Sequence, residues 1–469
     1  MDGLECTEIF LSALERTNRV DAEFYRKYTF EVLNELKKHN TRPLTDFVAV
    51  SDGNHMGISD KFQNEGIPYY RGQDIHNFFI ENANAICIDK DTFNLPYMRR
   101  SHLKKGDVLL SIVGTIGEVA LVSTDSPMTC NCKLAILRPK SDMPSEYIAA
   151  YLKTKYGFNQ IDKFKRGAVQ MGYLLEDMSQ IIVPVFSRDF QNKIKSLILE
   201  MYKLVNESKK MYENAKEKLI EILGLSNFKA EDKMYNIKSF SNSFGKTGRL
   251  DAEYYQPYYD EFEDIVKKHG FVLASDICEM INYGTVPTSP YTEDGTGTPY
   301  IKGMNVKNTE VDNEDLDRII NTELLPNKFF TKQGDIIISQ MGTVADCGVV
   351  DETQEGWLFA SFTIRLRLKK NAGFNPHFVG LYIQELAKKY YFYKNIAQAS
   401  VRQNTDLPTV NNLYIPKICI DTQNEIANML IKCKYLRQES KDKLNNSIRA
   451  VEIAVESGEK AALDFLANL

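Results

Sequence analysis

A series of short motifs in the first half of the chain returns in the same order about 230 positions later. The segment RVDAEFYRKY, from Arg19, returns as RLDAEYYQPY, from Arg249. The segment KKGDVLLSIVGTIGEVALV, from Lys104, returns as KQGDIIISQMGTVADCGVV, from Lys332. This period is far above the roughly 20–50 residues of solenoid repeats. The repeat therefore predicts a duplicated domain pair with the potential for pseudo-twofold symmetry.

Each copy contains an expected strand pair and an expected helix. The apolar runs DVLLSIV and DIIISQM each end in Gly-Thr and continue as a second apolar run, which predicts a strand, a tight turn and a strand. Helical spacing begins at Ser145 in the first copy and at Asn375 in the second, and we expect both residues to cap their helices.

Two longer segments, 187–224 and 421–467, contain no proline and read as long helices. Their apolar residues follow alternating steps of three and four, with a similar change of register in both, which is typical of paired helices. The seam positions are Ile194, Leu197, Met201, Leu204, Ile426, Met429, Cys433 and Leu436. We expect an α+β protein with two mixed α/β domains in tandem, separated and joined by two long antiparallel coiled-coil helices. The expected boundaries are 1–186, 187–225, 226–420 and 421–469.

Composition narrows the functional classes. A net charge of −5 and a pI of about 5.9 argue mildly against a lone nucleic-acid binder, although total charge does not describe local patches. The cysteines and histidines show no metal-ligand spacing, so we expect free thiols and no metal site. With no secretion-type leader and no apolar run of bilayer length, we expect a cytoplasmic protein.

The glycines of the repeated hairpin do not predict a phosphate-binding loop. Gly114 and Gly117 lack the lysine of such loops, a strand follows instead of a helix, and Ala345 replaces the second glycine in the other copy. Asp107 and Asp335 recur, but an aspartate after glycine at a strand start is more often a turn residue than an acid catalyst. With no esterase or methyltransferase signature present, we expect no catalysis by the chain alone.

Both copies carry a basic, aromatic-rich helix that suits DNA phosphate contacts. The alternative is a solvated helix face with its aromatic side chains in the core. The candidate phosphate-binding residues are Lys153, Lys163, Lys165 and Arg166 in the first copy, and Lys388, Lys389 and Lys394 in the second.

The loops after these helices keep their apolar positions but differ in their polar residues. Aligning Pro184 with Pro416 sets RGAVQMGY (166–173) against QASVRQNT (398–405). Arginine, glutamine and asparagine can distinguish bases in the major groove, so the divergence predicts two readers of different specificity; drift of exposed loops is the alternative. The candidate base readers are Arg71, Gln73, Gln170, Lys302, Asn305, Arg402, Gln403 and Asn404.

Together, the repeated Gly-Asp…Gly-Thr hairpins (106–116 and 334–344), the strand ends IIVP and LYIP, and the Gln-x-x-Ile helix openings resemble the DNA-specificity subunit of Type I restriction-modification systems. The resemblance covers nearly the whole chain. It implies two target recognition domains that each read half of a bipartite DNA sequence. It also implies that the two helices set the gap and dock two modification subunits.

The same resemblance places the chemistry in the partner subunits. It implies S-adenosylmethionine for adenine methylation there, and ATP with magnesium where restriction subunits are present, with no cofactor in this chain. Two other readings stay open: a scaffold or sensor of the same fold in phage defence, and a pseudo-dimeric enzyme, which the lack of shared catalytic residues disfavours.

Overall fold

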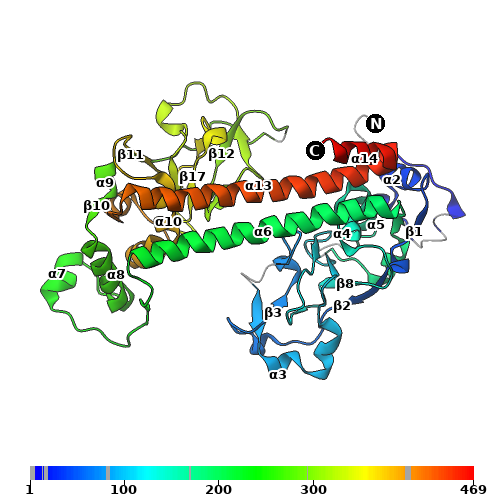
Figure 1. The fold of residues 1–469 in the computed structure, drawn as a ribbon, viewed down its shortest axis with the longest axis horizontal. Coiled ribbons are helices and arrows are strands. Elements are labelled where there is room, and N and C mark those ends of the chain that lie inside the picture. Colours follow the sequence, from blue (N-terminus) through cyan, green and yellow to red (C-terminus); the bar gives the residue numbers. More distant parts are fainter. Residues whose placement is uncertain are drawn as a thin grey trace. The chain divides into compact units, whose positions relative to one another are not determined.

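The computed structural model describes residues 6–12, 14, 19–80, 85–167, 171–292, 294–396 and 403–469. The chain forms two compact units: residues 1–205 with 438–469, and residues 206–437. The division falls inside both long helices, α6 (Arg188–Ile222) and α13 (Ile420–Ser457), which are visible in Figure 1. Each unit therefore holds one copy of the repeat together with a segment of each long helix. The boundaries expected from the sequence instead treated each long helix as a separate segment between the domains.

The described residues of the first unit form three small sheets. Their strand orders are β2-β8-β5-β6, β4-β3-β7 and β1-β9, and the four-stranded sheet is antiparallel throughout. The strands are β1 (Thr41–Pro43), β2 (Val48–Asp52), β3 (Ile67–Tyr70), β4 (Ile86–Ile88), β5 (Val108–Ser111), β6 (Val119–Leu121), β7 (Thr129–Cys130), β8 (Leu134–Pro139) and β9 (Ile182–Pro184).

The second unit repeats this topology and extends the largest sheet by two strands. The orders are β11-β19-β16-β17-β14-β13, β15-β12-β18 and β10-β20. The strands are β10 (Phe271–Leu273), β11 (Cys278–Tyr283), β12 (Thr298–Ile301), β13 (Val306–Lys307), β14 (Thr309–Val311), β15 (Asp317–Ile319), β16 (Ile336–Ser339), β17 (Cys347–Val349), β18 (Leu358–Phe359), β19 (Thr363–Leu368) and β20 (Tyr414–Pro416). The sequence repeat is thus a structural repeat, which confirms the expected pair of mixed α/β domains in tandem.

The helix expected from Ser145 is divided in two. Pro144, not Ser145, is the N-cap residue of α4 (Ser145–Lys153), so the predicted cap was wrong. Thr154 adopts an extended conformation and caps α5 (Lys155–Lys163) by accepting the N–H of Gly157 at 3.1 Å. A Cβ at Gly157 would lie 2.3 Å from the carbonyl oxygen of Tyr151, so the corner between the helices requires glycine. Other helices that the structure bounds in the described part of this unit are α2 (Lys27–Leu36), α3 (Lys90–Phe93) and α14 (Glu459–Ala467).

The corresponding helix of the second unit keeps its predicted cap. The Asn375 side chain accepts the N–H of His377 at 3.0 Å and caps α10 (Pro376–Tyr382). The chain then winds as a π-helix, η13 (Ile383–Phe392), and ends in α11 (Tyr393–Asn395). The other helices are α7 (Phe244–Thr247), α8 (Pro257–Lys268), α9 (Ala274–Ile277) and α12 (Leu407–Asn411).

The segments of α6 and α13 run antiparallel in the second unit. Ser208 donates to the carbonyl oxygen of Cys433 at 3.0 Å, and Lys218, ten residues further along α6, pairs with Glu425, which lies earlier in α13. In the first unit Glu200 pairs with Lys443 at 2.7 Å. Ser208 is 1% exposed and occupies the position where the apolar spacing of α6 is interrupted. The predicted antiparallel helix pair is confirmed within the units.

Candidate nucleic-acid interface

In the first unit, three loop segments meet beyond the end of the strand β5. The N–H of Tyr173 donates to the carbonyl oxygen of Ile112 at 2.8 Å, which fastens the segment 171–173 to the hairpin turn 112–117. On its other side, the hydroxyl of Thr115 donates to the carbonyl oxygen of Gly72 at 3.2 Å, within the short helix η4 (Gly72–Asp74). The structure therefore brings together both predicted reader segments and the Gly-Thr turn.

The second unit builds the same arrangement. The N–H of Thr405 donates to the carbonyl oxygen of Gln340 at 3.1 Å, and Asn404 forms an isolated β-bridge with Met341. On the other side, the short helix η10 (Gly303–Asn305) approaches β16 so closely that a Cβ at Gly303 would lie 2.8 Å from the Ser339 hydroxyl. We call these segments the convergent edge: 71–74, 112–117 and the described residues 166–167 and 171–173 in the first unit, and 302–305, 340–345 and 403–405 in the second.

The tip of each hairpin turn is exposed, at Gly114-Thr115 and at Gly342-Thr343. Both turns connect antiparallel strands, β5 to β6 and β16 to β17. The structure thus agrees with the expected hairpins, because no helix follows the glycines.

The predicted base readers differ in how exposed their side chains are. Gln73 and Gln403 are exposed, and Asn404 is half-buried. Gln170 and Arg402 lie outside the described residues, so their predicted roles stay predictions.

Three other predicted readers have partners within the fold. The guanidinium of Arg71 makes two contacts of 2.9 Å with the carboxylate of Asp74. Lys302 forms an ion pair with Asp317 at 2.5 Å. Asn305 is 3% exposed and accepts the backbone N–H of Lys302 at 2.9 Å. This burial counts against base contact by Asn305, which caps a turn as Asp74 does in the first unit.

Three of the four predicted phosphate-binding residues of the first unit are paired with carboxylates. Lys153 lies 3.3 Å from Glu118, Lys165 lies 2.5 Å from Asp162, and Arg166 lies 2.6 Å from Asp177. Burial raises the pKa of Asp177 even though a guanidinium lies beside it.

Lys163 lies over aromatic rings instead of beside a carboxylate. Its ammonium nitrogen is 4.5 Å from the ring centroid of Phe24 and 5.4 Å from that of Phe30. Burial, followed by repulsion from Lys37 and Arg19, lowers the pKa of Lys163 to about 8. An ammonium group that lies against aromatic rings is less accessible to a DNA phosphate than an exposed one.

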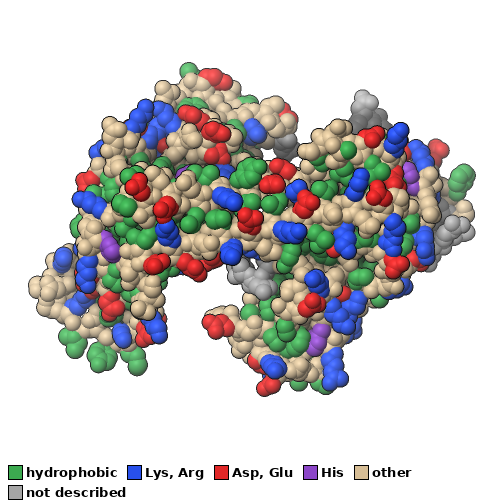
Figure 2. Space-filling view, viewed as in Figure 1, with side chains coloured by type: hydrophobic (Ala, Val, Ile, Leu, Met, Phe, Trp, Pro, Cys, Tyr) green, Lys and Arg blue, Asp and Glu red, His purple; other side chains and the backbone are tan. Residues whose placement is uncertain are grey.

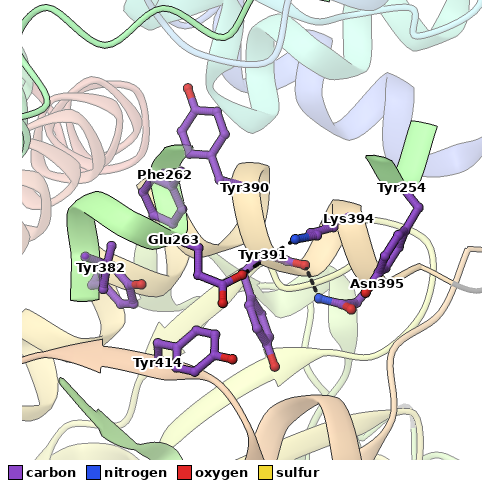
Figure 3. A pocket seen from close by; sticks show the side chains of 10 residues that line it. Tyr254, Phe262, Glu263, Tyr382, Tyr390, Tyr391, Lys394, Asn395 and Tyr414 are labelled. Carbon is purple, nitrogen blue, oxygen red and sulfur yellow. Dashed lines mark hydrogen bonds and ion pairs between the residues drawn. The ribbon is translucent and has the colours of Figure 1, made fainter. Parts of the chain in front are cut away.

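The corresponding lysines of the second unit are also paired. Lys388 pairs with Asp346, and Lys389, half of whose side chain is exposed, lies 3.8 Å from Glu385. Lys394 lies 3.0 Å from Asp260 and 3.5 Å from Glu263. Figure 3 shows Lys394 directed toward Glu263 beside a cavity of about 130 Å³, and half of the residues that line this cavity are tyrosines.

These pairings weaken the case for a basic surface on the two helices. The sequence places few carboxylates within the helical segments themselves, but Glu118, Asp177, Asp346 and Asp260 come from other parts of the chain. On the face shown in Figure 2, lysines and arginines are interspersed with acidic side chains. A DNA phosphate would have to displace the carboxylate from each of these side chains, so the pairings weaken phosphate binding.

The motif that begins at Arg19 has a structural role that the sequence did not disclose. Arg19 pairs with Asp21 at 2.7 Å and donates to the carbonyl oxygen of Lys165 at 3.3 Å. In the second unit Arg249 pairs with Asp251 at 2.6 Å and donates to the carbonyl oxygen of Ile396 at 3.2 Å. In both units the motif therefore holds the chain at the junction between the basic helix and the reader loop.

The seam residues of the two helices that are expected to dock partners face the protein's own cores. Most are buried in the two main hydrophobic clusters or in the helix seam, and the others are half-buried; the set is Ile194, Leu197, Met201, Leu204, Ile426, Met429, Cys433 and Leu436. Large apolar side chains that remain exposed on the long helices are Leu199, Ile420, Ile431 and Tyr435. A partner that docks on these helices would meet these outer residues, not the seam.

Within the described part of the chain, no group of three or more histidine, cysteine or acidic side chains is arranged to hold a metal ion. None of the described helices combines the length and apolar character of a membrane span.

Comparison with known proteins places the chain in a family. Its two segments 37–215 and 270–450 both match the Type I restriction modification DNA specificity domain. Among solved structures, the S subunit of a Type-I restriction-modification system from M. genitalium is 12% identical, with a TM-score of 0.43 and coverage of 91% of this chain and 95% of that one. The HsdS subunit from Thermoanaerobacter tengcongensis is 13% identical, with a TM-score of 0.30 and coverage of 89% and 97%.

No curated protein matches the chain. The two family matches fall on the two structural repeats and together cover well over half of the sequence. The chain therefore belongs to the Type I restriction modification DNA specificity domain family.

Proposed function

We propose that the chain directs a Type I restriction-modification complex to a bipartite DNA sequence, and that each unit reads one half-site in the major groove. The chain itself is non-catalytic. Two modification subunits bring S-adenosylmethionine and methylate adenine, and restriction subunits, where present, bring ATP with magnesium.

The observation that carries this proposal is the convergent edge. Both units hold its three segments in the same backbone frame, with equivalent hydrogen bonds from Tyr173 to Ile112 and from Thr405 to Gln340. The side chains on that frame differ: Met171 in the first unit aligns with Gln403 in the second. A constant frame with different side chains suits two readers of different base sequences, because side-chain amides and guanidiniums distinguish base edges in the major groove.

The paired helices set the gap between the half-sites and dock the modification subunits. Docking uses the exposed residues Leu199 on α6, and Ile431 and Tyr435 on α13, which are 40%, 50% and 67% exposed. Ile431 and Tyr435 are four residues apart and so share one face of their helix.

The chain alone should bind DNA weakly. Most of the lysines and arginines expected to contact phosphates are held by carboxylates of the same chain, and the net charge is −5. Phosphate neutralisation dominates the affinity of most DNA-binding proteins, so the partner subunits must supply much of it.

Methylation mapping tests the proposal. The chain is co-expressed with modification subunits from the same genomic locus, and the DNA is mapped by long-read sequencing. We expect a split motif with methyladenine in both halves that disappears when the chain is deleted. Exchanging residues 145–185 should alter one half-site, and exchanging residues 377–417 should alter the other. If no motif depends on the chain, the reader function is wrong and the scaffold reading replaces it.

A further inference from the structure

A fourth segment lies at the convergent edge of the first unit: the loop 131–133 between β7 and β8. The N–H of Ile112 donates to the carbonyl oxygen of Lys133 at 2.9 Å, and the N–H of Asn131 donates to that of Tyr70 at 2.9 Å. A Cβ at Gly72 would lie 3.5 Å from the Cβ of Lys133. The loop is therefore fixed between the hairpin turn and η4.

The side chain of Lys133 differs from those of the other basic residues near this edge. Lys133 is exposed, and among the described residues no ion pair or side-chain hydrogen bond involves its ammonium group. Lys153, Lys165 and Arg166, by contrast, each lie within 3.3 Å of a carboxylate oxygen. The ammonium group of Lys133 is thus available to a ligand.

The second unit keeps the backbone at this position but replaces the side chain. The N–H of Gln340 donates to the carbonyl oxygen of Phe362 at 3.0 Å, just as the N–H of Ile112 donates to that of Lys133. Phe362 is half-buried and packs against the apolar cluster that contains Tyr300. At this position the two units share a backbone hydrogen bond but carry a charged side chain in one and an apolar side chain in the other. The position can therefore give the two units different sequence preferences.

Resting on the proposed function, we propose that Lys133 is a base reader of the first half-site, and that it donates hydrogen bonds to a guanine. Lysine can reach the O6 and N7 acceptors of guanine in the major groove, and these two acceptors together distinguish guanine from the other bases. A phosphate contact would need the same positive charge but would add no sequence preference.

The test uses the complete methyltransferase complex and three variants of this chain. Lys133→Met keeps most of the length of the side chain and removes its charge, whereas Lys133→Arg keeps the positive charge and N–H donors. Lys105→Met is the matched control, because Lys105 is exposed in the same unit at the opposite end of β5. Motifs are mapped by long-read sequencing. Methylation rates are then measured on duplexes that carry each base at each position of the first half-site.

We expect Lys133→Met to lower the preference for guanine at one position of the first half-site by about tenfold or more, with the second half-site unchanged. Lys133→Arg should retain that preference, and Lys105→Met should leave the motif intact. An unchanged motif in Lys133→Met overturns the inference. A uniform loss of methylation on all duplexes also overturns it, since that result marks a phosphate contact. If the wild-type chain specifies no motif, the proposed function fails together with this inference. That outcome differs from the two above, in which the wild-type chain still specifies a motif.

Discussion

Arg138 and Asp107 form a two-pronged ion pair, with Nε 2.9 Å from Oδ1 and Nη2 2.7 Å from Oδ2. Arg367 and Asp335 repeat it in the second unit, with both contacts at 2.7 Å. Each aspartate also accepts a hydrogen bond from the backbone N–H three residues earlier, at 2.8 Å. The aspartate of the repeated Gly-Asp pair thus fastens the hairpin to the neighbouring strand, which accounts for its recurrence without any catalytic role.

Asp335→Asn should destabilise the second unit strongly. Asp335 is fully buried and also lies 3.4 Å from the fully buried Arg365, so the neutral amide would leave two arginines poorly compensated. Removing one partner of a buried ion pair costs about 3–5 kcal/mol. Trp357, the only tryptophan, reports unfolding of this unit by fluorescence in urea. Glu323→Gln, at an exposed position, is the control, and equal stabilities of the two variants would contradict the prediction.

Ile194→Ala should destabilise the first unit far more than Leu199→Ala. Ile194 is fully buried in the main cluster of that unit, whereas Leu199, on the same helix, is 40% exposed. Truncating a buried isoleucine loses the free energy gained when its methyl and methylene groups leave water, and it leaves a cavity. Together these effects cost about 2–5 kcal/mol. Calorimetry of the two variants measures the difference. A neutral Ile194→Ala would mean that the seam does not belong to the core.

Much of the fold was predictable because the chain repeats itself. The recurrence of the Gly-Asp and Gly-Thr pairs fixed the hairpins β5–β6 and β16–β17, and apolar spacing predicted both long helices. The division of the helix at Thr154 was not predicted, because the spacing of apolar residues continues across the corner. The corner depends on a single close approach at Gly157, which no periodic pattern reveals.

The site was less predictable, since it depends on residues that are distant in sequence. Counting charges within a helix could not reveal that Arg166 pairs with Asp177 or that Lys394 pairs with Asp260. The position of Lys133 gave no signal either, because one lysine in an apolar segment matches no motif. Its place at the convergent edge follows from the pairing of β8 with β5 and from the contacts of the loop with Tyr70 and Gly72.

Lys163→Met should stabilise the first unit at neutral pH and do so less as the pH rises. The folded state lowers the pKa of Lys163 from 10.5 to about 8, so between these values the unfolded chain binds more protons. The stability of the wild-type chain therefore rises with pH across this window, and below about pH 8 the cost of burying the charge is fully present. Melting temperatures at about pH 7 and pH 9.5 test this, with Lys105→Met as the exposed control. A gain that is independent of pH would show that the benefit comes from packing alone.

Gln73→Ala should change base preference and Arg71→Ala should change stability, although the two residues lie within one short segment. The side chain of Gln73 is exposed, so its removal should relax the base preference of the first half-site by about tenfold without changing the melting temperature. Arg71 holds Asp74 through two contacts of 2.9 Å, so its removal should destabilise the turn by about 1 kcal/mol and weaken all sites alike. Methylation rates on substituted duplexes and melting curves of both variants separate the two effects. Arg71→Ala could instead change the preferred base while the melting temperature stays constant. That result would mean that Arg71 leaves Asp74 to contact a base, and its assignment as a structural residue would be wrong.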